Sequence, residues 1–146
     1  MRSITGSVFV GLLVGSLGAV QLFAQPRPAP TSALEGSRWA VTVTPDEQAK
    51  QQGEKPFEDT LIFTQGKVSM SACAKYGFAS STYRASQAGE HWTFQTEQLS
   101  RKEGKTVWNA VTTGDAISGT LVWTKKNGAI LHYTFEGKKL ARSKAS

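Results

Sequence analysis

The last third of the chain contains four segments that are rich in β-branched and aromatic residues and are joined by short polar turns. The segments are residues 91–100, 106–113, 116–124 and 129–135, and each turn carries a glycine. Turns this short make neighbouring strands pair antiparallel, because parallel neighbours need a long crossover connection. The sequence therefore predicts four consecutive antiparallel strands, and the rest of the chain has to complete their sheet.

Four further strands are predicted upstream, because apolar and polar residues alternate there. They cover residues 38–44, 57–64, 67–72 and 81–86. Alternation places every second side chain on the same face of a sheet. In these strands the predicted inward residues are Trp39, Val41, Val43, Phe57, Asp59, Leu61, Phe63, Val68, Met70, Tyr83 and Ala85. In the last four strands they are Trp92, Phe94, Trp108, Ala110, Ile117, Leu121, Trp123, Leu131, Tyr133 and Phe135, with Val107 and Val111 as a competing face.

The stretches between these strands are expected at the surface. Residues 45–56 are polar and lack an apolar stripe, which favours a solvated loop with one or two helical turns over a core helix. A lid over one end of the fold is the alternative for this loop. Residues 73–78 are expected to be irregular. The chain after Gly137 is basic and is expected to fray.

Eight strands with hairpin-length connections favour an all-β fold, an eight-stranded antiparallel up-and-down barrel. Closure removes the two exposed edges that an open sheet would have. A β-sandwich is the alternative, but its Greek-key connections are longer than these turns. The interior of an eight-stranded barrel is either filled by side chains or just wide enough for one small ligand.

The N-terminal segment has the pattern of a targeting signal. Arg2 precedes an apolar, uncharged run that ends at residue 24, and a proline-rich polar stretch follows. This pattern predicts a cleavable signal helix at residues 1–24 and therefore an exported protein, periplasmic or extracellular. An uncleaved anchor is the alternative, since the run is roughly a bilayer's span, and membrane contact is expected only in that case.

Behind that segment the sequence predicts three parts. Residues 25–33 form a disordered proline-rich leader, residues 34–140 form one barrel domain, and residues 141–146 form a basic tail. Without residues 1–24, the 146-residue chain keeps 122 residues, which suits a single domain. We expect the domain to be a monomer.

Charge and cysteine content narrow the functional classes. The formal net charge is +6, but the cations lie mostly at turns and in the tail, where lysines serve solubility and edge protection. Because an exported protein rarely meets nucleic acid, no nucleic-acid partner is expected. Cys73 is the single cysteine, so no intramolecular disulfide can form. We expect its side chain to be a small buried hydrophobe, the alternative being a reactive or intermolecular thiol.

The sequence contains no catalytic signature. His91 and His132 have no cysteine or aspartate at a telling spacing, and His132 is out of phase with the inward residues of its strand. Two histidines and one cysteine do not predict a zinc site, and the glycines lie singly at turns. We expect no enzyme activity, no metal and no cofactor. Asp59 either orients a ligand at the barrel mouth or is a strand-end carboxylate that reaches water.

The stretch Gly36-Ser37-Arg38-Trp39 resembles the Gly-x-Trp opening of the lipocalin-like (calycin) barrels, with one additional residue before the tryptophan. The resemblance implies that Trp39 plugs the closed end of the barrel beneath a cation, here Lys138 or Lys139. The chain is also similar to small exported bacterial proteins of unassigned role. They share a Val-Thr-Pro first strand and a Gly-Thr-Leu-x-Trp-Thr-Lys-Lys-x-Gly hairpin, here residues 119–128.

Aromatic residues on consecutive strands are the feature that bears most on function. The residues expected to face a cavity are Trp92, Phe94, Trp108, Leu121, Trp123, Tyr133, Phe135 and Asp59. Such walls suit a small apolar ligand, while the alternative is a filled aromatic core. The sequence thus favours an exported, non-enzymatic barrel that binds a small apolar molecule or an envelope component. The alternative is a solid-core interaction or inhibitor module that meets a protein or envelope partner through its basic surface and loops.

Overall fold

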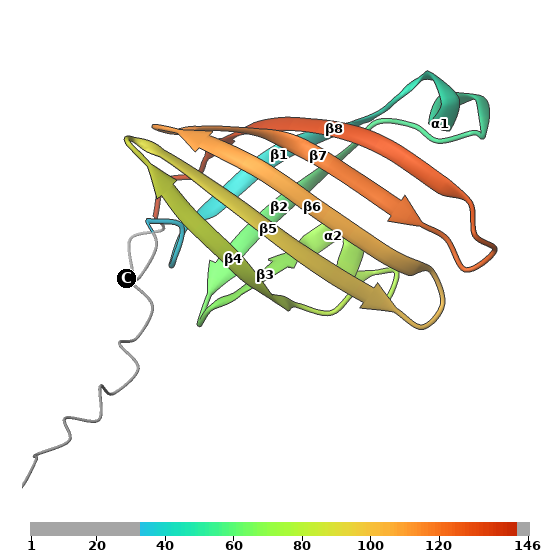
Figure 1. Cartoon of the computed structure of the whole chain (residues 1–146), viewed down its shortest axis with the longest axis horizontal. Helices are drawn as coiled ribbons and strands as arrows, with labels where there is room; N and C mark the ends of the chain where they lie inside the picture. The colour runs from blue at the N-terminus through green and yellow to red at the C-terminus, as the bar shows by residue number, and fades with distance from the viewer. Residues whose placement is uncertain (1–32, 143–146) are drawn as a thin grey trace, which may run out of the picture.

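The computed structural model describes residues 33–142, which form an eight-stranded closed antiparallel barrel (Figure 1). The predicted signal helix, the leader except Ala33, and residues 143–146 of the tail lie outside this range. The strands are β1 (Arg38–Pro45), β2 (Phe57–Thr64), β3 (Lys67–Met70), β4 (Ser81–Ala88), β5 (His91–Ser100), β6 (Gly104–Thr113), β7 (Ala116–Thr124) and β8 (Ile130–Lys139). Each strand pairs with the next along the chain, and β8 returns to pair with β1. The predicted up-and-down barrel is confirmed, and the sandwich alternative is wrong.

Two short helices lie at the same end of the barrel. Helix α1 (Glu47–Gln51) follows β1, and the Asp46 side chain caps it by accepting the Ala49 N–H at 2.8 Å. This confirms the expected helical turn, although its Ala49 is fully buried. Helix α2 (Ser71–Ala74) follows β3. Neither of these helices, within residues 33–142, is long and apolar enough to cross a membrane.

Helix α2 corrects the prediction of a strand as far as residue 72 and an irregular segment from residue 73. The strand ends at Met70 because Asp59 on β2 draws the chain into a turn. The Asp59 Oδ1 atom accepts hydrogen bonds from the Ala72 N–H at 2.7 Å and the Ser71 hydroxyl at 3.2 Å. A buried carboxylate thus satisfies the donors at the helix start, in the manner of a helix cap.

The middle of the barrel is filled with aromatic and aliphatic side chains. The ring centroid of Phe63 lies 4.9 Å from that of Tyr83 and 5.0 Å from that of Phe94. Trp108 is fully buried, and its ring centroid is 5.1 Å from that of Phe135. Strand β6 therefore turns Trp108 and Ala110 inward, whereas the competing Val111 is exposed.

Strand β4 departs from its predicted phase. Tyr83 is half-buried, but Ala85, expected inward, is exposed. The reason is that β3 is short: β3 and β4 pair only at Lys67↔Thr82 and Val68↔Ser81. Beyond this contact β4 pairs with β5 alone, so nothing from β3 covers Ala85.

Strand β8 continues to Lys139, so the expectation that the chain frays after Gly137 is wrong. Gly137 pairs with Val41 of β1 and with Ile117 of β7. A Cβ atom at this position would lie 1.9 Å from the carbonyl oxygen of Ala40. Glycine therefore lets β8 approach β1 closely where the barrel closes.

Candidate functional site

One end of the barrel is closed around Trp39. This side chain is buried, and its indole N–H donates to the Ser37 hydroxyl at 2.8 Å. The Ser37 hydroxyl in turn donates to the Leu34 carbonyl, so the segment before β1 is fixed against the plug. The Lys139 Nζ atom lies 5.9 Å from the Trp39 ring centroid, within the range of a cation–π contact. Of the two lysines suggested by the lipocalin resemblance, Lys139 has this position.

The opposite end holds a cavity of about 530 Å³, which we call the mouth pocket. It lies between the chain that follows α1, helix α2 with the loop after it, and the ends of β6, β7 and β8. Its aromatic walls are Phe57, Tyr76, Phe78, Trp123 and Tyr133. The rings of Phe57 and Tyr133 meet edge-on at a centroid distance of 6.2 Å, and those of Phe78 and Trp123 at 6.4 Å.

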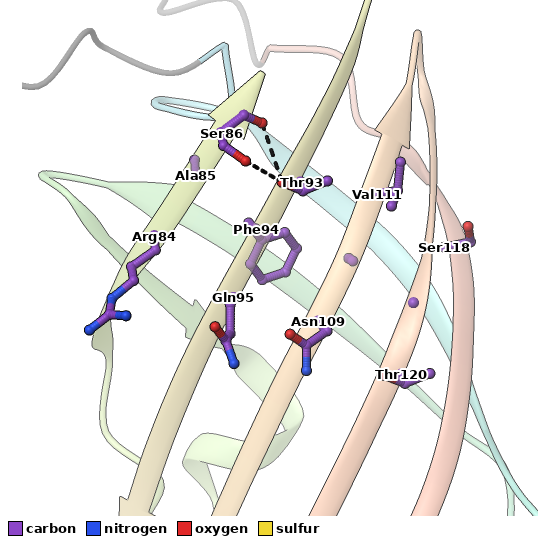
Figure 2. A pocket seen from close by; sticks show the side chains of 12 residues that line it. Arg84, Ala85, Ser86, Thr93, Phe94, Gln95, Asn109, Val111, Ser118 and Thr120 are labelled. Carbon is purple, nitrogen blue, oxygen red and sulfur yellow. Dashed lines mark hydrogen bonds between the residues drawn. The ribbon is translucent and has the colours of Figure 1, made fainter. Parts of the chain in front are cut away.

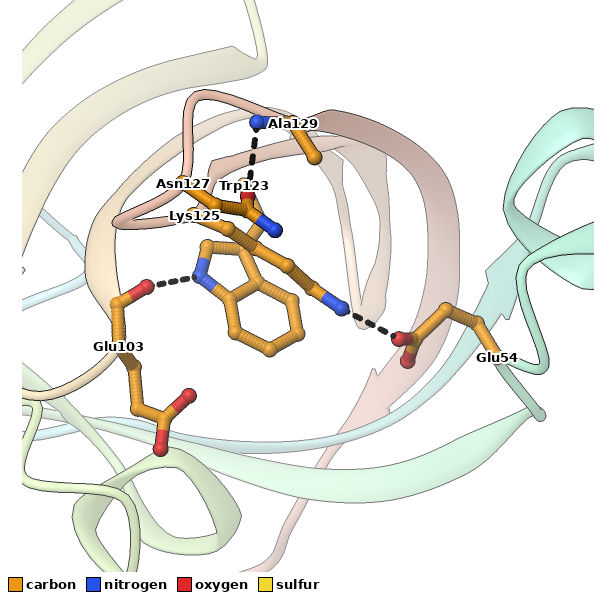
Figure 3. A network of polar contacts seen from close by, with 6 residues as sticks. All are labelled: Glu54, Glu103, Trp123, Lys125, Asn127 and Ala129. Atoms are coloured by element: carbon orange, nitrogen blue, oxygen red, sulfur yellow. Dashed lines mark hydrogen bonds and ion pairs between the residues drawn. The ribbon is translucent and has the colours of Figure 1, made fainter.

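Polar contacts hold Trp123 in place at the rim of the mouth pocket (Figure 3). Its indole N–H donates to the Glu103 carbonyl at 2.8 Å. The Lys125 Nζ atom lies 4.7 Å from the Trp123 ring centroid and forms an ion pair with Glu54 at 3.1 Å. Lys125 therefore links the β7–β8 hairpin to the segment after α1. Because each charge of this pair has a partner, the rim offers little free charge at this point.

A group of buried polar atoms without hydrogen-bond partners begins at the mouth pocket with Thr106 and continues into the barrel. Thr106 lines the pocket and is 3% exposed, and its hydroxyl has no partner among residues 33–142. Gln98 lies directly opposite on β5; its amide nitrogen donates to the Ala79 carbonyl at 3.0 Å, while its Oε1 atom is unpartnered. The buried Trp108 indole N–H, two residues along β6, is also unpartnered. Buried polar groups are normally hydrogen-bonded, so Thr106, which borders the pocket, is a candidate contact for a polar atom of a ligand.

Two titratable side chains of the pocket wall, Cys73 and Tyr133, have raised pKa values. Burial raises the pKa of the Cys73 thiol well above its ordinary value of 9.0, and the nearby Asp59 charge raises it further. Burial also raises the pKa of the Tyr133 phenol, with a second contribution from the Glu54 carboxylate. Both side chains therefore stay protonated at neutral pH and give the wall no charge.

The residues predicted to face one cavity are spread along the whole barrel. Trp123 and Tyr133 line the mouth pocket, whereas Trp92 lies at the other end of β5, half-buried and paired with Thr112. The remaining apolar candidates fill the midsection and are buried: Phe94, Trp108, Leu121 and Phe135.

Asp59 does not reach water, since only 4% of it is exposed, so the interpretation as a solvated strand-end carboxylate is wrong. Its Oδ1 atom is engaged at the start of α2, while its Oδ2 atom has no partner in the described range.

Sequence reasoning missed several residues of the mouth pocket. Thr106 shares the inward phase of Trp108, two residues away, and this alternation was a usable signal. Phe78 and Cys73 belong to the segment that was expected to be irregular, and they reach the pocket because the chain after β3 folds back over the barrel end. No local sequence pattern could have placed Glu54 at the pocket, because its partner Lys125 is 71 residues away in the sequence.

A second hollow, of about 450 Å³, lies on the outer wall across β4 to β7 (Figure 2). It lies over Gly119, where a Cβ atom would come within 2.0 Å of the Asn109 carbonyl oxygen. Its lining is mostly polar, and two of the lining side chains, Ser86 and Thr93, bond each other at 2.6 Å. Phe94 is the one aromatic residue of this lining and is only 3% exposed. The mouth pocket is therefore the better candidate for a ligand site.

Residues 33–142 show no grouping of side chains typical of a metal or catalytic site. This part of the chain has no cluster of three or more histidine, cysteine, aspartate or glutamate side chains suited to a metal ion. His91 is exposed and bonds the Thr113 hydroxyl at 2.9 Å, and His132 is exposed on β8. Cys73 is close to Asp59, and neither histidine borders the mouth pocket.

The closed eight-stranded barrel has the architecture that the lipocalin resemblance implied. The chain matches no protein-family model, no curated protein and no solved structure. Its function has to be inferred from the site itself.

Proposed function

We propose that this protein is a non-enzymatic binding protein of the lipocalin-like type, whose mouth pocket holds one small, uncharged, mainly apolar molecule with a single hydroxyl or amide group. The observation that carries the proposal is the unpartnered hydroxyl of Thr106 at the floor of an aromatic-walled cavity. A hydroxyl can donate and accept, as can the ligand group that would meet it.

The dimensions and chemistry of the mouth pocket support this class of ligand. Its volume of about 530 Å³ lies within the range typical of small-molecule sites. Phe57, Phe78 and Trp123 offer ring faces and edges to an apolar body. Cys73 and Tyr133 stay protonated, and Lys125 is already paired with Glu54, so these three wall residues offer a ligand no free charge. Lys55 and Lys75 also line the pocket, but both are exposed to solvent at its edge.

The wider assignment is part of the same proposal. The protein is exported through residues 1–24 and acts as a monomer on a small molecule. An enzymatic role is disfavoured because the one cysteine of the chain has a protonated thiol with a carboxylate, not a histidine, beside it.

The proposal is tested by NMR with 2-naphthol and, as a matched control, naphthalene, which lacks the hydroxyl group. The four tryptophans give four indole N–H signals that report on different places in the barrel. We expect 2-naphthol to shift the signals of Trp123 and Trp108, and to leave those of Trp39 and Trp92 unchanged. Because a site with unpaired polar groups discriminates against an analogue that cannot pair with them, naphthalene is expected to bind more weakly.

The Thr106→Val variant completes the test. It keeps the shape of the side chain and removes the hydroxyl, so it is expected to bind 2-naphthol and naphthalene equally. Absence of any shift at Trp123 with 2-naphthol and related apolar phenols would refute the pocket and favour the solid-core interaction module. Equal shifts at Trp92 would show adsorption to apolar surfaces in general.

A further inference from the structure

The outer wall of the barrel carries an exposed apolar group next to the mouth. Leu99 near the end of β5 is 65% exposed, and Ile130 at the start of β8 is 51% exposed. The register aligns them across four strands, since Leu99 pairs with Lys105, Lys105 with Thr124, and Thr124 with Ile130. One pair further from the mouth, the half-buried Val107 and Val122 face each other. Together these four apolar residues form what we call the hairpin patch.

Unpaired cations border the hairpin patch. Arg101 and Lys102 lie in the β5–β6 turn, Lys126 lies in the β7–β8 turn, and all three are exposed. Within residues 33–142 none of the three forms an ion pair. Lys105, in contrast, is engaged with Glu97 at 3.7 Å. The two hairpin tips therefore combine exposed aliphatic side chains with free positive charge.

The opposite side of the mouth has a different character. Asp46 caps helix α1, Glu47 is its first residue, and Lys50 is bonded to Glu47 at 2.7 Å. This rim is polar and carries no large exposed apolar residue among those described. Residues 46–55 carry three acidic side chains against two lysines, so this side attracts an anionic surface less than the β5–β6 and β7–β8 hairpins do.

We propose that the hairpin patch docks the barrel on the surface of a lipid bilayer that contains anionic lipids. Leu99 and Ile130 enter the boundary between headgroups and acyl chains, while Arg101, Lys102 and Lys126 contact lipid phosphates. Interfacial segments bind membranes by the same two contributions, the burial of apolar area and the attraction of cations to anionic lipids. The contact is made by the barrel itself and does not involve residues 1–24.

A bilayer fits these residues better than an acidic protein. The aliphatic side chains and the cations lie on two neighbouring hairpin tips that point the same way (Figure 1). They surround no pocket of their own that would seat a partner side chain, since the cavity at this end opens inside the strands. Docking in this orientation also places the mouth pocket beside the membrane surface, where an apolar ligand would be concentrated.

The test is co-sedimentation of the purified protein with vesicles of phosphatidylcholine alone or mixed with phosphatidylglycerol, without any pocket ligand. We expect binding to the anionic vesicles that weakens with salt. Each surface cation contributes roughly a fivefold gain in partitioning, so reversing three with Arg101→Glu, Lys102→Glu and Lys126→Glu should reduce it about a hundredfold or more. Leu99→Asn with Ile130→Asn should also weaken binding, by roughly tenfold or more.

A matched control reverses three exposed cations elsewhere, by Lys67→Glu, Arg84→Glu and Lys138→Glu. We expect this control to retain most of the vesicle binding, because those residues lie away from the mouth. An equal loss in the control would overturn the proposal, since it would show attraction to net charge alone. So would binding to polyglutamate without binding to anionic vesicles, which would indicate an acidic protein partner. The naphthol experiment is independent of these outcomes, because it contains no lipid.

Discussion

Replacing Thr106 with valine should stabilise the ligand-free protein while it removes the preference for a ligand that carries a hydroxyl group. Thr106 is 3% exposed, and its hydroxyl has no partner in the described structure. Burying a hydroxyl without a hydrogen bond costs about 1–3 kcal/mol in proteins. Valine has the same branched shape and leaves the strand packing intact. We therefore expect Thr106→Val to raise the free energy of unfolding by about 1–2 kcal/mol.

The assay is urea unfolding of the ligand-free protein, with Thr96→Val as the matched control. Thr96 lies on the neighbouring strand β5 and is also 3% exposed. Its hydroxyl donates to the Thr82 carbonyl at 2.8 Å and lies 2.7 Å from the Ser81 hydroxyl. Valine at this position leaves those groups unsatisfied, so we expect a loss of about 1–3 kcal/mol. The same substitution at two equally buried threonines should thus have opposite signs.

Either of two results would refute this reasoning. If Thr106→Val destabilised the protein as much as Thr96→Val does, the Thr106 hydroxyl would be satisfied in the ligand-free protein. If Thr106→Val kept its preference for 2-naphthol over naphthalene, the hydroxyl would play no part in recognition. A stability gain together with a lost preference is the combination expected of a residue kept for binding at a cost in stability.

Three further outcomes are expected from the same structure. Gly137→Ala would place a Cβ atom 1.9 Å from the Ala40 carbonyl oxygen and should lower stability by about 1–3 kcal/mol or more, measured as the thermal midpoint; an unchanged midpoint would contradict the close approach of β1 and β8. Trp108→Ala should cost about 3–5 kcal/mol in urea unfolding, against a clearly smaller loss for the half-exposed Trp92→Ala; equal losses would contradict a filled midsection. The free energy of unfolding should fall by roughly 1.4 kcal/mol per pH unit above about pH 9, because only the unfolded chain then releases the Cys73 proton. In the Cys73→Ala variant this contribution to the fall should be missing. If the variant lost stability with pH as steeply as the wild type, the thiol would have to be in contact with water.

The barrel could be read from the sequence because most strands have one clearly apolar face. In β1 the burial of Trp39, Val41 and Val43 follows directly from alternation, and the short turns left antiparallel pairing as the simplest solution. Strand β6 is apolar on both faces, so alternation could not decide between Trp108 and Val107. The filled interior decides it, because the large indole packs against Phe135 across the barrel.

The mouth pocket was harder to foresee because its parts are distant in sequence. The bend that creates α2 depends on Asp59, 12 and 13 residues before the groups it binds. That bend brings Cys73 and Phe78 to the barrel end, and no local sequence pattern predicts the bend. Aromatic content alone suggested one shared cavity, but strand position separates Trp92 from Trp123 by the length of the barrel. Lack of a partner at Thr106 is a property of its surroundings and has no signature in the chain.

The central claim, that the mouth pocket holds a small molecule, is tested most directly by native mass spectrometry of the protein purified gently from its own host. We expect the wild-type protein to carry one bound small molecule that is lost on unfolding. The Thr106→Val variant, prepared in the same way, should carry clearly less of this molecule, whereas a Trp92→Phe control should carry as much as the wild type. A bare protein mass in the wild type, with no uptake of added 2-naphthol, would contradict the claim.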